Sequence, residues 1–174
     1  MVFGILAGFS FMGTLEPVAP SLFWGFGMSF CLLRLLILRL DLFLPHHSRN
    51  TPEEAFTHEL PERVSDAVIL IGFGFAAESN HWLGLSTALA AIFSAYVRSI
   101  GMQRGANRRS VAIGPMTRSH RLILVSAASL LMMLGLPPVE LDTSLPQIAL
   151  WVILFGCITT ILMRWFNIRD WKEE

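Results

Sequence analysis

Three acidic residues stand at the mouth of one apolar stretch of the chain: Glu59, Glu62 and Asp66 precede the apolar run 67–77. A helix that starts at Pro61 places Glu62 and Asp66 one turn apart on the same face. The apolar run is shorter than the roughly 20 residues needed to cross a bilayer. A spanning helix must therefore include the acids, and an ionisable residue at membrane depth is by default a functional-site hypothesis.

Acids and arginines are expected to meet on one face of the membrane. Asp41 ends the preceding apolar stretch, and the arginine-rich segment Arg98–Arg121 follows later in the chain. Carboxylate oxygens are ligands that suit Mg²⁺ or Mn²⁺, and guanidinium groups pair with phosphate oxygens. These residue types together predict a site that stabilises a pyrophosphate between a divalent ion and arginines.

The elements that must position these residues are apolar helices. The chain of 174 residues is 53% apolar with a mean hydropathy of +0.57, and blocks such as Ile148–Met163 are apolar on all sides. This pattern predicts an all-α, polytopic membrane protein with six transmembrane helices in a single domain, residues 1–174. The six blocks are Val2–Met12, Ser21–Leu38, Val64–Ala77, Trp82–Val97, Leu122–Leu136 and Ile148–Phe166.

The basic residues predict how these helices cross the membrane. All 13 Lys and Arg can be placed on one side of a six-span arrangement, and the connections Leu15–Ser21, Glu78–His81 and Pro137–Gln147 contain none of them. Arg34 and Arg39 are expected to reach the inner interface, and Arg98–Arg121 is expected to be a basic loop. Arg164, Arg169 and Lys172 are expected to form the tail. By the positive-inside rule both termini are cytoplasmic, and the acidic site faces the cytoplasm. The basic connections serve topology alone or also bind anionic head groups. Nucleic-acid binding is not expected, because the sequence offers no soluble domain to carry it.

Local signals refine two of these helices. Thr51-Pro-Glu-Glu54 reads as a helix start with a capping box, which predicts a short surface helix before Pro61 restarts the chain as the third span. Small residues recur along the fourth block and predict close helix packing, either inside the protein or at a dimer seam. These small residues are Gly84, Ser86, Ala88, Ala91 and Ser94.

At this point the chain resembles the CDP-alcohol phosphatidyltransferase family, whose signature is D-x-x-D-G-x-x-A-R followed by G-x-x-x-D-x-x-x-D. The second half falls on His58-x-x-x-Glu62-x-x-x-Asp66, and Arg34-Leu-Leu-Ile-Leu-Arg-Leu-Asp41 occupies the place of the first half. The segment Gly114–Arg121 resembles a later cytoplasmic segment of the family.

The resemblance implies a reaction and a set of roles. A phosphatidyl group would pass from a CDP-diacylglycerol-type donor to a small alcohol acceptor, releasing CMP, in phospholipid synthesis at the bacterial inner membrane. Asp66 would be the general base. Membrane lipids would surround the protein, and a homodimer is left open. The implied Mg²⁺ or Mn²⁺ ligands are Asp41, Glu62 and Asp66, and the implied phosphate-binding residues are Arg98, Arg118 and Arg121.

The chain departs from the signature at several positions. Leu38 stands at the first signature Asp, Leu42 at the following Gly and His58 at the Gly of the second half. These departures keep open a catalytically impaired relative that acts as a non-enzymatic membrane protein. A small transporter with Asp66 as a proton or cation relay is a further alternative.

Overall fold

The computed structural model describes residues 1–16, 19–40, 52–103, 113–135 and 144–170, except for the side chains of 52–59 and 169–170. Asp41, Leu42 and Thr51 lie outside these ranges, and so does the side chain of His58. Every regular element within them is an α-helix. The helices are α1 (Val2–Gly13), α2 (Pro20–Leu40), α3 (Pro52–Gly74), α4 (His81–Gln103), α6 (Arg118–Met133) and α7 (Leu145–Asp170).

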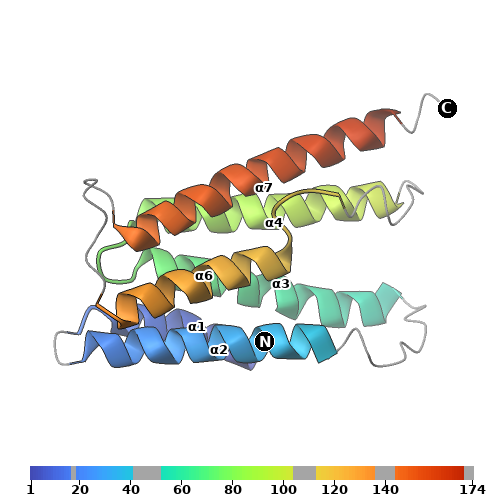
Figure 1. Cartoon of the computed structure of the whole chain (residues 1–174). Helices are drawn as coiled ribbons and strands as arrows, with labels where there is room; N and C mark the ends of the chain where they lie inside the picture. The colour runs from blue at the N-terminus through green and yellow to red at the C-terminus, as the bar shows by residue number, and fades with distance from the viewer. Residues whose placement is uncertain (17–18, 41–51, 104–112, 136–143, 171–174) are drawn as a thin grey trace.

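The six helices form a ring in which each packs against two main neighbours. In order around the ring these are α1, α2, α6, α7, α4 and α3, and α3 packs again against α1. Figure 1 shows the C-terminal ends of α1, α3 and α6 at one end of the bundle and those of α2, α4 and α7 at the other. Helices α1 and α6 both begin part-way along the bundle.

Three of the helices are long and apolar enough to cross a membrane. They are α2, α4 and the part Leu145–Ile168 of α7, while α1 is a shorter apolar helix. The prediction of an all-α membrane protein is confirmed to this extent: the described chain is helical and has three helices that can span. Each of the six apolar blocks overlaps one helix, although the bounds of the block and the helix differ.

Helix α3 contradicts the expected break at Pro61. We predicted a short surface helix and a fresh start at this proline, but α3 runs unbroken from Pro52 to Gly74 with Pro61 inside it. Proline lacks the backbone N–H that would bond to the carbonyl four residues earlier, so one helical hydrogen bond is lost. The regular turns on both sides keep the chain helical across this single gap.

The predicted loop Arg98–Arg121 is also wrong in its bounds. Helix α4 continues to Gln103, and α6 already begins at Arg118, so all three arginines predicted to bind phosphate are helical. Their side chains are therefore held by regular backbone, which fixes their directions more firmly than a loop would.

The end of the bundle at which α1, α3 and α6 finish (Figure 1) has an aromatic core. Phe11 of α1 and Trp24 of α2 meet Phe73 of α3 in edge-to-face and tilted contacts, with ring centroids 5.1–5.7 Å apart. Phe11 and Phe73 are fully buried. Close helix approach complements this core, because a Cβ on Gly72 would lie 2.3 Å from the backbone oxygen of Gly8.

The small residues of α4 pack inside the protein, as the first of the two alternatives predicted. Gly84, Ala88, Ala91 and Ser94 are buried against the ring, whereas Ser86 is exposed. Gly84 meets Gly74 of α3, where an added Cβ would lie 2.5 Å from the opposite Cα. The stripe therefore serves contacts within one chain.

Candidate functional site

Asp66 lies at the centre of three arginines that come from two other helices. Nη2 of Arg34 on α2 donates to Oδ1 at 2.9 Å. Nε of Arg118 lies 2.9 Å from Oδ2, and Nη2 of Arg121 lies 3.5 Å from the same oxygen. The side chains of Asp66, Arg34 and Arg121 are each less than a tenth exposed. Both carboxylate oxygens are thus engaged by guanidinium groups.

Glu62, one turn earlier on α3, completes this set. Nη1 of Arg118 donates to its Oε2 at 2.7 Å, and the Glu62 side chain is 43% exposed. The backbone oxygen of Glu62 also accepts hydrogen bonds from Arg34 and Arg118, both at 3.0 Å. We call these five side chains the Asp66 cluster: Arg34, Glu62, Asp66, Arg118 and Arg121.

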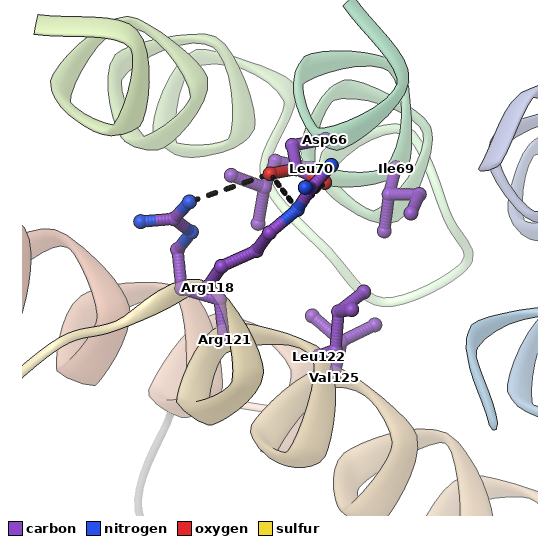
Figure 2. Close-up of a pocket in the computed structure, with 7 residues that line it drawn as sticks. All are labelled: Asp66, Ile69, Leu70, Arg118, Arg121, Leu122 and Val125. Carbon is purple, nitrogen blue, oxygen red and sulfur yellow. Dashed lines mark hydrogen bonds and ion pairs between the residues drawn. The ribbon is translucent and has the colours of Figure 1, made fainter. Parts of the chain in front are cut away.

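The cluster crosses the interior of the helix ring. Helix α3 has its main packing contacts with α1 and α4, yet Asp66 reaches α2 and α6 through ion pairs. Figure 2 shows Arg118 and Arg121 extending from α6 towards Asp66, with Leu122 and Val125 beneath them. Apolar packing on one side of the ion pairs limits the access of water to them, and this strengthens their attraction.

A short extended segment before α6 sets the position of Arg118 and Arg121. The backbone N–H of Met116 donates to Oγ1 of Thr160 on α7 at 3.1 Å. Gly114 has a φ of +141°, and a Cβ there would lie 2.3 Å from the Thr160 side chain, so only glycine fits. The segment is therefore fixed against α7 just before the first turn of α6.

Arg164 of α7 holds the same segment through a further hydrogen bond. Its Nε donates to the Ile113 carbonyl at 3.0 Å, and its Nη1 donates to the Ser94 carbonyl at 2.7 Å and to the Ser94 hydroxyl at 3.0 Å. We expected Arg164 to mark a cytoplasmic tail, but it is a buried residue that joins α7, α4 and the segment before α6.

Two pockets border the Asp66 cluster. One has a cavity volume of only about 10 Å³ and is lined by Asp66, Arg118 and Arg121 together with apolar residues of α3 and α6 (Figure 2). The other has a cavity volume of about 80 Å³, is partly open and combines polar and apolar walls. Its lining residues are Met1, Phe3, Arg34, Ile37, Leu38, Glu62, Arg118 and Leu122.

The described residues do not fit the implied divalent cation. Within the cluster three guanidinium groups face two carboxylates, which leaves an excess of one positive charge. Each Asp66 oxygen already accepts an arginine N–H, and Leu38 contributes no ligand to the adjoining pocket. In the part of the chain that the structure describes, no three His, Cys, Asp or Glu side chains lie close enough to share a metal ion.

Most of the predicted site residues come together. Glu62, Asp66, Arg118 and Arg121 all belong to the cluster, and the shared face of Glu62 and Asp66 is confirmed by their common partner Arg118. Arg98 is half-buried on α4, within electrostatic reach of Arg164. The roles assigned to these residues stay predictions, and Asp41, the third predicted metal ligand, is outside the described residues.

Sequence reasoning missed Arg34 as a site residue. We placed it with Arg39 at the inner interface, yet the structure buries Arg34 beside Asp66 while Arg39 is exposed. A signal was present: Arg34 lies well inside an apolar stretch, where a charged residue needs a partner.

Comparison of the chain with protein-family models, with curated proteins and with solved structures finds no match in any of the three.

Proposed function

We propose that this chain is a membrane-embedded transferase of the CDP-alcohol phosphatidyltransferase type. It would pass a phosphatidyl group from a CDP-activated lipid to an alcohol and release CMP. The observation that carries the proposal is the Asp66 cluster: its three arginines and two carboxylates are shared between two pockets that also have apolar walls. Such a pocket suits a ligand with charged phosphates and acyl chains.

The arginines of the cluster are the phosphate-binding groups in this proposal. A guanidinium group donates parallel hydrogen bonds to two phosphate oxygens, and Arg34, Arg118 and Arg121 present three such groups. The alcohol oxygen forms a bond to the phosphatidyl phosphorus, while the bond from that phosphorus to the CMP oxygen breaks. Asp66 takes the proton of the alcohol, and CMP leaves with the bonding electron pair.

The proposed arrangement in the membrane has six spans and cytoplasmic termini. Two observations support it: each apolar block forms a helix, and the helix ends that flank the connections without Lys or Arg gather at one end of the bundle (Figure 1). By the positive-inside rule that end faces away from the cytoplasm. We place the protein in a bacterial inner membrane, with the Asp66 cluster open towards the cytoplasm.

A second candidate is a non-catalytic relative that binds the lipid without transferring its phosphatidyl group. The engagement of Asp66 favours this candidate. Both of its oxygens accept arginine N–H bonds, so a general base must first exchange an arginine for the alcohol. Leu38, where the signature has an acid, points the same way.

CMP release from purified protein tests the proposed function. Protein in lipid nanodiscs receives CDP-diacylglycerol and a panel of alcohols (glycerol phosphate, inositol phosphate and serine), with Mg²⁺, with Mn²⁺ or with EDTA. Asp66→Asn is compared with Glu78→Gln, a carboxylate beyond the opposite end of α3. The transferase predicts release that is lost in Asp66→Asn and kept in Glu78→Gln.

Direct binding of CDP-diacylglycerol separates the two candidates. Wild-type protein that binds the lipid but releases no CMP with any acceptor is the non-catalytic relative. Folded protein that neither binds the lipid nor releases CMP contradicts both candidates.

A further inference from the structure

Arg34 holds a buried hydrogen-bond donor that has no partner among the residues that the structure describes. Its Nη2 is bonded to Asp66 and to the Glu62 carbonyl, but its Nε is buried and makes no hydrogen bond to any of these residues. A buried charged donor left unpaired is costly, and such groups in native proteins call for an unseen acceptor. The same side chain lines the larger of the two pockets.

The walls of that pocket suit a lipid phosphate. Arg34 and Arg118 supply positive charge beside the Glu62 carboxylate, while Phe3, Ile37 and Leu122 supply apolar surface. Ile37 is also 44% exposed on the outside of α2, so the pocket adjoins the surface that acyl chains would cover. A phosphate with attached chains can satisfy the guanidinium groups and the apolar wall together.

Guanidinium groups supply in this pocket the positive charge that a divalent ion would otherwise supply. In a metal site, carboxylates hold a cation, and the cation binds phosphate. Here guanidinium groups already neutralise Asp66 and Glu62 and leave one positive charge in excess. A divalent ion would have to displace arginines from Asp66 and overcome their repulsion.

We propose that the pocket between Arg34 and Arg118 binds the phosphate groups of a lipid without a divalent metal ion, the two guanidinium groups standing where the resemblance implies a metal. The choice of a CDP-activated lipid rests on the proposed function. Metal-independent binding does not, because it follows from the charges of the Asp66 cluster.

Titration calorimetry on protein in phosphatidylcholine nanodiscs tests this inference. The probe is CDP-dioctanoylglycerol, measured in EDTA and again in Mg²⁺, and CDP alone is the comparison for the apolar wall. We expect equal affinity in EDTA and Mg²⁺, and an affinity for CDP at least about tenfold weaker, because CDP leaves the apolar wall uncovered. Arg34→Gln should weaken binding about tenfold or more, since it removes a charged donor.

Arg39→Gln is the matched control for Arg34→Gln. Arg39 lies in the last turn of the same helix and is exposed. Its substitution should change affinity less than about twofold. Equal loss in the two variants, or CDP binding as tightly as the lipid, overturns the proposed pocket.

The wild-type measurement decides the metal question even if a variant fails to fold. Binding that vanishes in EDTA and returns with Mg²⁺ overturns metal-independent binding while leaving the proposed function intact. No binding in either condition, together with no CMP release, instead contradicts the proposed function.

Discussion

Asp66 is tied to more of the molecule than any other acid that the structure describes. Its partners belong to α2 and α6, and its side chain is nearly inaccessible. Burying charges is expensive, so a buried ion pair is weak evidence for net stability. Removing one member is a different matter, because its partners are then left charged and uncompensated. The Asp66 carboxylate therefore supplies the negative charge that allows three arginines to be buried close together.

At this scale the expected outcome is a large loss of stability in Asp66→Asn. The variant leaves Arg34, Arg118 and Arg121 facing one another with Glu62 as their remaining acid in the cluster, and we expect a loss of about 3–5 kcal/mol. Thermal unfolding in detergent, followed by circular dichroism, measures it.

Glu62→Gln is the matched comparison for that measurement. Glu62 is 43% exposed, and within the cluster its carboxylate pairs only with Arg118. The Glu62→Gln variant should lose about 0.2–1 kcal/mol of folding stability. If the two variants unfold at the same temperature, the cluster does not have the central charge that we assign to Asp66.

The elements that hold the cluster differ in how they are fixed. Helix α3 packs closely against α1 through glycines and joins the aromatic core, whereas α6 packs mainly against α2, and its first turn follows a segment that is fixed to α7. Thr160 and Arg164 on α7 bind that segment by hydrogen bonds to its backbone. The arginines of α6 therefore depend on α7, a helix that contributes no residue to the cluster.

Thr160→Val is expected to expose this dependence. The variant leaves the buried N–H of Met116 without an acceptor, which costs about 1–3 kcal/mol. It should also weaken binding of CDP-dioctanoylglycerol, because Arg118 follows directly after the loosened segment. Chemical unfolding and calorimetry on the same preparation check the two effects.

Thr159→Val provides the neighbouring control. Thr159 is exposed, and its hydroxyl bonds only to the Phe155 carbonyl of its own helix among the described contacts. Both quantities should stay close to the wild type. A Thr160→Val protein that behaves like Thr159→Val would show that the segment does not position α6.

Helices were the part of the fold that could be predicted from sequence. Apolar blocks of this length can satisfy their backbone in a membrane chiefly as helices, so each block gave one helix. Their ends are less predictable: the sequence predicts a break at Pro61, where α3 continues, and a loop over Arg98–Arg121, where α4 continues to Gln103 and α6 begins at Arg118. Neighbouring helices stabilise backbone that the local sequence alone would leave open.

The site could be predicted only in part. The one-turn spacing of Glu62 and Asp66 follows from helix geometry, but no local pattern says which helix stands opposite. Arg34 is 32 residues away from Asp66 in the chain and Arg118 is 52 away, so their pairing depends on the ring order of the helices. The prediction that Arg164 belongs to the tail is wrong for the same reason, since its partners lie on α4 and before α6.

Positive charge is distributed unevenly along the bundle. The helix ends that flank the connections without Lys or Arg lie together at one end of the bundle (Figure 1), and the aromatic core lies beside them. Arg118 of the Asp66 cluster stands at the start of α6, which begins part-way along the bundle. In the proposed six-span topology the long axis of the bundle runs along the membrane normal. This topology also places exposed apolar side chains, such as Phe26 and Phe155, against lipid.

Cysteine labelling in intact bacterial cells tests that topology. In a background that replaces Cys31 and Cys157, a cysteine is introduced at Leu15, after α1, or at Met102, in the last turn of α4; both positions are exposed. An impermeant maleimide should label Leu15→Cys in intact cells and Met102→Cys only after permeabilisation. The reverse pattern, or labelling of both in intact cells, contradicts cytoplasmic termini.

The order of the helices along the chain determines when the cluster can close during synthesis. Helix α3 leaves the ribosome with Asp66 well before Arg118 and Arg121 have been made. Of its described partners, Arg34 is the one already present when α3 enters the membrane. Arg34 can thus act as a temporary counter-ion for a carboxylate that would otherwise enter the bilayer alone. In the finished protein this early pair forms one side of the proposed phosphate pocket.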